Sequence, residues 1–252
     1  MRRFFLILEY DGGPYVGWQR QANGRSIQQA LEEAVEKFCQ QKTTAAAAGR
    51  TDAGVHALGM PAHIDIDVAA SADTVRDAIN FHLRPEPIAV LAAREAPESL
   101  HARFSAVARH YAYIIVPRRA PLAIQVGKAW RITAPLNVDA MHRAAQVLIG
   151  RHDFTTFRAA QCQSKSPVKS MDDVAVKRVA DRIEVTASAR SFLHHQIRSI
   201  VGSLVEVGVG KWTEGDFAAA LAAKDRTACG PVAPPDGLYF VRADYPTDQA
   251  LG

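Results

Sequence analysis

The greatest concentration of chemically useful side chains lies in Gly49-Arg50-Thr51-Asp52-Ala53-Gly54-Val55-His56-Ala57. Arginine, aspartate and histidine stand here among glycines, which allow a backbone to approach a ligand closely. An ordinary aspartate, with a pKa of about 3.9, is charged at neutral pH and can act as a nucleophile. An Asx turn, in which Asp52 only bonds local backbone amides, is the alternative. On residue chemistry alone, we rank the turn ahead of catalysis.

The elements expected to carry this loop begin with a strand over residues 4–10, which is nearly all apolar and ends at Asp11-Gly12-Gly13-Pro14. Ser26 and Gln29 match a capping box, so we predict a helix behind them with one face packed on a sheet. A second amphipathic helix is predicted over residues 73–83.

The second half begins with an alternating strand over residues 109–116, which places Arg109, Tyr111 and Tyr113 on one face. Asn137 is the predicted cap of a third helix that ends at Gly150. The remaining predictions are a hairpin of residues 174–179 and 183–189, a helix over 192–207, a short helix opened by Thr213 and Asp216, and a strand over 238–245. In the long helix, His194 and Arg198 are expected to line up on one stripe.

Strands and helices do not alternate regularly, which favours an α+β class over a doubly wound sheet. We place a boundary near residues 104–108, which gives an N-terminal lobe of residues 1–106 and a C-terminal lobe of residues 107–252. The strand that holds Tyr111 opens the second lobe, and Asp52 lies in the first.

Composition narrows the class of protein. The 252 residues are 48% hydrophobic, with a net charge of +4 and a pI near 9.0, which permits an anionic partner without demanding one. The cysteines, Cys39, Cys162 and Cys229, lack metal-ligand spacing and argue against both a disulfide framework and a structural zinc site. No apolar run approaches the roughly 20 residues needed to cross a bilayer, so we expect a cytoplasmic protein without a membrane segment.

The loop around Asp52 resembles the signature of the tRNA pseudouridine synthase A family, in which it carries the catalytic aspartate. Further matches to that family run along almost the whole chain: Tyr10-Asp11-Gly12, Gly17-Trp18-Gln19, His101-Ala102-Arg103, Ser105-Ala106, Arg109-His110-Tyr111-Ala112-Tyr113, His152-Asp153-Phe154, Phe157-Arg158, Cys162, Lys165-Ser166-Pro167, Phe192-Leu193, Gln196-Ile197-Arg198, Pro234 and Gly237-Leu238-Tyr239. The chain departs from the family pattern at Gln196, where relatives more often carry methionine, and at Met60-Pro61. Neither departure touches the aspartate.

The resemblance implies a fold of two similar lobes of mostly antiparallel sheet with helices packed on them, and an active-site cleft between the lobes. It implies that the protein isomerises uridine to pseudouridine at positions 38, 39 and 40 in the anticodon stem-loop of tRNA. A homodimer is implied as well. The reaction has no net oxidation and transfers no group from outside, so we expect neither a metal nor another cofactor.

The resemblance also implies roles for single residues. Asp52 is the expected nucleophile, and Arg198 its expected ion-pair partner, because a guanidinium can bind a carboxylate through two hydrogen bonds. Tyr111 would stack on the target uracil after the base leaves the helix. Arg50 would contact the RNA or the flipped nucleotide. Without the resemblance, Arg198 would be read as a solvated charge and Tyr111 as an ordinary half-buried strand residue.

Other residues have supporting expectations. Tyr113 is assigned a structural role, and His56 is expected to bind the RNA backbone or to prop the loop. A set of cations is expected to supply phosphate contacts: Arg103, Arg109, Arg118, Arg119, Arg158, Lys165 and Lys169.

Two other classes of protein compete with this interpretation. A non-enzymatic protein that binds structured RNA could use the same tyrosine strand and cations without needing Asp52. A carboxylate-dependent nucleoside hydrolase would normally carry a second acid, and no D-x-D or E-x-x-E pair accompanies Asp52. The ordered family motifs favour the synthase over both.

Overall fold

The computed structural model describes residues 1–246 and confirms the α+β class. This part of the chain contains ten strands and five α-helices, which form two compact units. The first unit comprises Met1–Arg109 and the described residues from Tyr239 onward, and the second comprises His110–Leu238. None of the helices within residues 1–246 has the length and apolar content needed to span a membrane.

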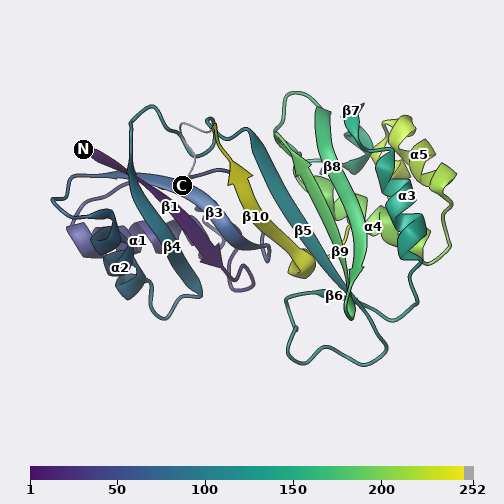
Figure 1. Ribbon diagram of the computed structural model, residues 1–252, viewed down its shortest axis with the longest axis horizontal. Coiled ribbons are helices and arrows are strands. Elements are labelled where there is room, and N and C mark those ends of the chain that lie inside the picture. Colours follow the sequence, from purple (N-terminus) through teal and green to yellow (C-terminus); the bar gives the residue numbers. More distant parts are fainter. Residues whose placement is uncertain (247–252) are drawn as a thin grey trace. The chain divides into compact units, whose positions relative to one another are not determined.

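The sheet of the first unit has β1 near its centre. Its strands are β1 (Arg2–Tyr10), β2 (Ala46–Ala47), β3 (His56–Ile66), β4 (Ile88–Ala96) and β10 (Leu238–Asp244). The order is β4-β1-β3-β10 (Figure 1), and the short strand β2 pairs with β3. Phe4, Phe5 and Leu6 are all buried, as predicted for a strand with both faces covered.

The closing strand β10 joins this sheet although it lies far along the chain from its partner. Tyr239 and Phe240 pair in parallel with His56 and Ala57 at the start of β3. The predicted second lobe of residues 107–252 differs from this arrangement, because nothing in the sequence of a strand reveals a partner about 180 residues away. The start of β3 is also where the loop of Asp52 ends.

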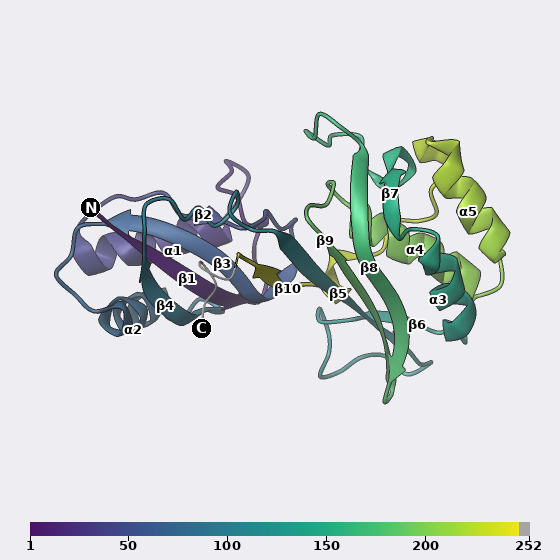
Figure 2. The same cartoon turned by 45° about the horizontal axis from the view of Figure 1, so that its top comes forward.

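Two helices complete the first unit, α1 (Ile27–Cys39) and α2 (Ala72–Leu83), and both lie beside its strands in Figures 1 and 2. The Ser26 hydroxyl accepts the amide of Gln29 at 3.1 Å, which confirms the predicted helix start. The side chain of Gln29 donates to Glu33 at 2.9 Å, so the cap is one-sided.

The second unit is built on the order β5-β9-β8-β7, with β6 paired to β5. Its strands are β5 (Ala108–Pro117), which begins in the first unit, β6 (Trp130–Ile132), β7 (Gly150–Asp153), β8 (Val168–Val179) and β9 (Arg182–Ala189). The predicted hairpin is confirmed, because Val179 pairs with Arg182 across a turn of Ala180 and Asp181. Helices α3 (Val138–Gln146), α4 (Gln196–Gly208) and α5 (Glu214–Ala223) gather beside these strands (Figure 1).

Two predicted helix boundaries are wrong. Helix α3 ends at Gln146, and Gly150, with φ of 96°, instead opens β7. Helix α4 begins at Gln196 and not at residue 192, because His195 adopts a left-handed conformation with φ of 63°. His194 therefore lies outside the helix, and the expected stripe of His194 and Arg198 does not form. By contrast, Thr213 and Asp216 make a complete capping box on α5, as predicted.

Candidate active site

The loop that carries Asp52 runs from the end of β2 to the start of β3 and turns sharply. The amide of Val55 donates to the carbonyl of Asp52 at 3.1 Å, and Gly54 takes a positive φ of 78°. Asp52 also forms an isolated antiparallel bridge with Gly17. Its backbone is therefore held on both sides, and its side chain is half-buried.

Gly17 and Trp18 join this loop to the first turn of α1. The amide of Trp18 donates to the carbonyl of Thr51 at 3.0 Å, while Gly17 accepts from Ile27 at 3.1 Å. Gly17 has φ of 109°, and a Cβ atom there would lie 2.6 Å from the Thr51 carbonyl oxygen. Only glycine satisfies both the backbone conformation and this close approach.

The end of β1 supports the loop from a second direction. The Tyr10 hydroxyl lies 2.9 Å from the Thr51 hydroxyl, and both groups are buried. A Cβ atom on Gly12 would come within 2.0 Å of the Val55 carbonyl oxygen, so the two backbones are in direct contact. The Tyr10-Asp11-Gly12 sequence thus acts as a support for the Asp52 loop.

His56 props the loop. Its side chain is only 2% exposed, and its ring stacks on Tyr239 with 4.8 Å between ring centres. Nδ1 accepts the amide of Gly12 at 3.1 Å and lies 3.0 Å from a carboxylate oxygen of Asp11. This burial supports the loop-propping alternative of the two expected for His56, and leaves little surface for RNA.

Arg50 is exposed in the same loop, two residues before Asp52. Within residues 1–246, no acidic side chain pairs with its guanidinium. A cation of this kind beside the candidate nucleophile is available to an anionic ligand. The first unit thus brings two of the four predicted site residues, Arg50 and Asp52, into one braced loop.

The other two residues, Tyr111 and Arg198, belong to the second unit. Tyr111 lies on β5, is half-buried, and meets the ring of Phe192 edge to face with 5.1 Å between centres. Tyr113 is fully buried and its hydroxyl donates to the carbonyl of Pro234 at 2.7 Å, so its predicted structural role is confirmed. Burial raises the pKa of Tyr113 well above its usual value.

Arg198 sits in the first turn of α4 and is half-buried. Its Nε donates to the carbonyl of Ala233 at 2.8 Å, and the amide of Ala233 donates back to the Arg198 carbonyl at 3.1 Å. Gly202, one turn on, lets Pro231 approach so closely that a Cβ atom would lie 1.6 Å from the Pro231 carbonyl oxygen. The segment that precedes β10 therefore fixes the position of the Arg198 side chain.

Gln196 gives the turn before α4 its shape. This side chain is 1% exposed, and its amide oxygen accepts the backbone amide of Leu193 at 2.8 Å. The turn carries Phe192, whose ring meets Tyr111. The Gln196 side chain thus has a structural role that the sequence did not predict.

Arg109 is the clearest correction among the expected phosphate contacts. Its side chain is buried, with donors directed at the carbonyl oxygens of Ala48, Ala106 and Arg103. An arginine occupied in this way has no exposed face for phosphate. The alternation along the strand already placed Arg109 on the same face as Tyr113, which is the signal that could have predicted its burial. Arg103, Arg118, Arg119 and Lys165 are exposed, as phosphate contacts require.

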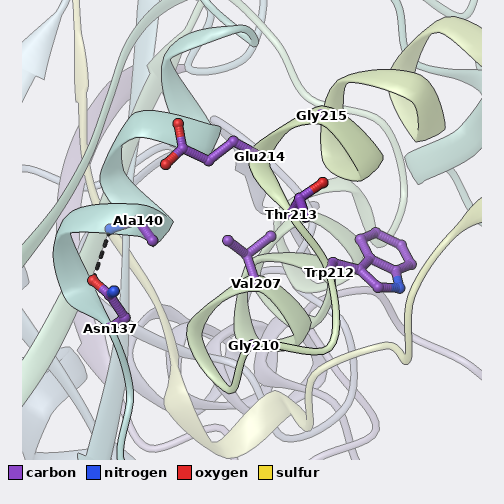
Figure 3. Close-up of a pocket in the computed structure, with 8 residues that line it drawn as sticks. All are labelled: Asn137, Ala140, Val207, Gly210, Trp212, Thr213, Glu214 and Gly215. Carbon is purple, nitrogen blue, oxygen red and sulfur yellow. Dashed lines mark hydrogen bonds between the residues drawn. The ribbon is translucent and has the colours of Figure 1, made fainter.

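A hollow of about 500 Å³ lies in the second unit near the starts of α3 and α5. Figure 3 shows Trp212 and Glu214 on different sides of it. Glu214 forms an ion pair with Arg143 at 2.8 Å, and none of the four predicted site residues lines the hollow.

Comparison with known proteins gives consistent matches. The family model described as "tRNA pseudouridine synthase" matches residues 6–105 and 144–246. The chain is 59% identical over 245 residues to tRNA pseudouridine synthase A of Parvibaculum lavamentivorans, covering 97% of this chain and 100% of the relative. The protein of the same name from Maricaulis maris is 56% identical over 246 residues, covering 98% and 99%. That of Afipia carboxidovorans is 59% identical over 245 residues, covering 97% and 100%.

Proposed function

This chain belongs to the tRNA pseudouridine synthase family, and from that premise we propose that it converts uridine to pseudouridine at positions 38, 39 and 40 of the tRNA anticodon stem-loop. The reaction breaks the bond between N1 of uracil and C1′ of ribose, rotates the base, and joins C5 to C1′. Atoms and electrons balance within the substrate, so the protein has to supply only a nucleophile or base, and positioning.

Asp52 is the proposed catalytic residue. An ionised carboxylate can add to C6 of uracil, attack C1′, or remove the 2′ proton, and each of these routes begins from the charged form. The observation that carries this assignment is the bracing of the loop: Gly12, Gly17 and His56 hold its backbone, while the Asp52 side chain remains partly accessible. Such support is what a precisely placed catalytic group requires.

The remaining roles follow the same proposal. Tyr111 offers a ring to the target base, Arg198 keeps the charge-pairing role that the family resemblance implies, and Arg50 contacts the RNA. The edge-to-face contact with Phe192 fixes the plane of the Tyr111 ring, which favours a stacking role. Arg50 is exposed and has no acidic partner in the described part of the chain, which leaves it available to phosphate.

The direct test uses three anticodon stem-loop transcripts, each with a single uridine at position 38, 39 or 40. After incubation with the protein, a pseudouridine-specific chemical label reports conversion at each position. We expect labelling of all three. Binding without any label would favour the non-enzymatic RNA-binding alternative, and labelling only at other positions would overturn the proposed specificity.

We further propose that the protein acts in the cytoplasm as a homodimer. Cytoplasmic tRNA is the substrate that this assignment requires, and the dimer rests on the family resemblance. Light scattering of the purified protein at several concentrations tests the dimer, since a particle of about twice the chain mass of 27.4 kDa is expected. A constant mass of one chain would overturn it.

A further inference from the structure

The loop between β4 and β5 presents an aromatic ring and a cation together on the surface of the first unit. Phe104 is 72% exposed, and the guanidinium carbon of Arg103 lies 5.6 Å from the centre of its ring. The ring of His101 is tilted against that of Phe104, with 4.4 Å between the two ring centres. The ring is therefore held in place although most of its surface faces solvent.

A single exposed apolar side chain is ordinary on a protein surface and carries no argument alone. Phe104 differs because the loop around it is fixed. Leu100 and Ala102 are buried against Phe5, and the Tyr245 hydroxyl donates to the Ala102 carbonyl at 2.6 Å. The chain segment that leads into the exposed pair is thus anchored in a small core.

Two histidines hold the tip of the loop. Nδ1 of His101 accepts the amides of Arg103 at 3.1 Å and of Phe104 at 3.4 Å. Nδ1 of His63 accepts the amide of Ala102 at 3.2 Å. Burial, with a smaller contribution from Arg3, lowers the pKa of His63 to about 4, so the ring stays a neutral acceptor at neutral pH.

Arg109 connects this loop to the loop of Asp52. From its buried position it donates to the carbonyl oxygens of Arg103 and of Ala106, and through Nε and Nη2 to that of Ala48 at 3.2 and 3.0 Å. Ala48 stands four residues before Asp52 in the same connection. One guanidinium thus fixes the exposed pair and the candidate catalytic loop in a single arrangement.

From this geometry we propose that Arg103 and Phe104 form an RNA docking site, in which Phe104 stacks on a nucleobase other than the reacting uridine and Arg103 contacts a phosphate. The inference rests on the proposed tRNA substrate. A fixed aromatic ring beside a cation is the arrangement that binds unstacked bases irrespective of their identity. Within residues 1–246, no acidic side chain pairs with Arg103, which is exposed. Charge therefore favours RNA over a second copy of this basic chain.

The test compares ring variants at position 104 for binding to a full-length tRNA transcript. Phe104→Ala and Phe104→Leu should weaken binding at least about fivefold, whereas Phe104→Tyr, which keeps the ring, should bind within about twofold of the parent. Phe81→Ala is the matched control, because Phe81 is 66% exposed on α2 of the same unit and lies outside the proposed site. Its binding should equal that of the parent.

The cation is tested separately. Arg103→Gln should reduce the slope of log K against log salt by about 0.7 to 0.9, the contribution of one phosphate contact. Since both side chains at the tip are exposed, the variants should fold, and their melting temperatures check this directly. An unchanged salt slope would remove Arg103 from RNA contact.

Three outcomes would overturn the docking site: parent-like binding of Phe104→Ala, parent-like binding of Phe104→Leu, or an equal loss in Phe81→Ala. A change of particle mass in Phe104→Ala with unchanged tRNA binding would identify the loop as a contact between protein copies instead. Failure of the proposed function is read separately, from pseudouridine formation by the parent protein on the same transcript. Binding comparisons among the variants stay interpretable in that case.

Discussion

At the scale of single residues, substitution of Asp52 is expected to act on catalysis, whereas substitution of its neighbours is expected to act on the loop. The loop backbone is held by hydrogen bonds and glycine contacts that do not involve the carboxylate. A substitution of Asp52 can therefore remove the carboxylate while leaving the loop backbone in place. His56 and Thr51, by contrast, are buried, and changing them would disturb the loop itself.

We expect Asp52→Asn to abolish pseudouridine formation while leaving the Kd for tRNA within about tenfold, roughly 1.4 kcal/mol. Asparagine is nearly isosteric and retains turn hydrogen bonds, but lacks the charge that each route needs. Chemical labelling and equilibrium binding measure the two effects. Asp67→Asn, at an exposed aspartate just beyond β3, serves as the control and should leave both unchanged. Turnover near the parent rate in Asp52→Asn would mean that another residue is the nucleophile.

The second residue-scale prediction separates the ring of Tyr111 from its hydroxyl. Tyr111→Ala removes the proposed stacking partner, worth roughly 1 to 3 kcal/mol, whereas Tyr111→Phe keeps the ring and its contact with Phe192. We expect the alanine variant to lose about five- to 100-fold in kcat/KM, and the phenylalanine variant to lose far less. Single-turnover assays on one stem-loop transcript give both values. Equal losses would show that the reaction uses the hydroxyl.

At the scale of elements, the Asp52 loop depends on backbone contacts that leave no room for a methyl group. Gly12→Ala would place Cβ 2.0 Å from the Val55 carbonyl oxygen, so backbone must move. We expect a loss of about 1 to 3 kcal/mol in unfolding free energy, with much reduced activity. Its neighbour provides the control: Cβ in Gly13→Ala would meet only the Asp11 carboxylate at 3.2 Å. Thermal unfolding should distinguish the two, and a stable, active Gly12→Ala would show that the contact is unimportant.

Elements whose signals are local were predictable from the sequence. Side-chain caps start α1 and α5, and apolar periodicity marks their buried faces, so both helices occur where expected. The start of α4 was not predictable, because the left-handed conformation of His195 depends on the turn that Gln196 closes. Strand β3 was also missed: Gly59 and Pro61 interrupt its pattern, and its pairing with β1 and β10 is non-local.

The residues of the candidate site also differ in how far the sequence alone predicts their roles. Residue types and spacing drew attention to the loop of Arg50 and Asp52 but favoured a turn there. The family resemblance is what gives Asp52, Arg50, Tyr111 and Arg198 their expected roles. Neither could show which groups the Arg109 side chain binds, since the carbonyl groups of Ala48 and Ala106 meet only in the folded chain. Its charge suggested phosphate binding, whereas burial decides what a charged group can contact.

At the scale of the whole molecule, the net charge of +4 understates the cations open to RNA. Many arginines are engaged within the protein: Arg3 with Asp65, Arg25 with Glu33 and Glu86, and Arg143 with Glu214. Other exposed cations pair with no acid within residues 1–246, and five of them were expected RNA contacts from the sequence: Arg50, Arg103, Arg118, Arg119 and Lys165. Local unpaired charge, not the total, should therefore govern affinity.

The final prediction follows from that distribution. Each phosphate neutralised by a protein cation releases counterions and contributes about −0.7 to −0.9 to the slope of log K against log salt. If about four of these five cations contact phosphate, tRNA affinity should fall roughly 100-fold between 50 and 200 mM salt. Fluorescence anisotropy over that range measures the slope. Arg76→Gln is a suitable control, because Arg76 already pairs with Asp73 and Asp77 on α2 and should leave the slope unchanged. A tRNA affinity that does not change with salt in the parent would contradict an RNA substrate, because phosphate contacts release counterions.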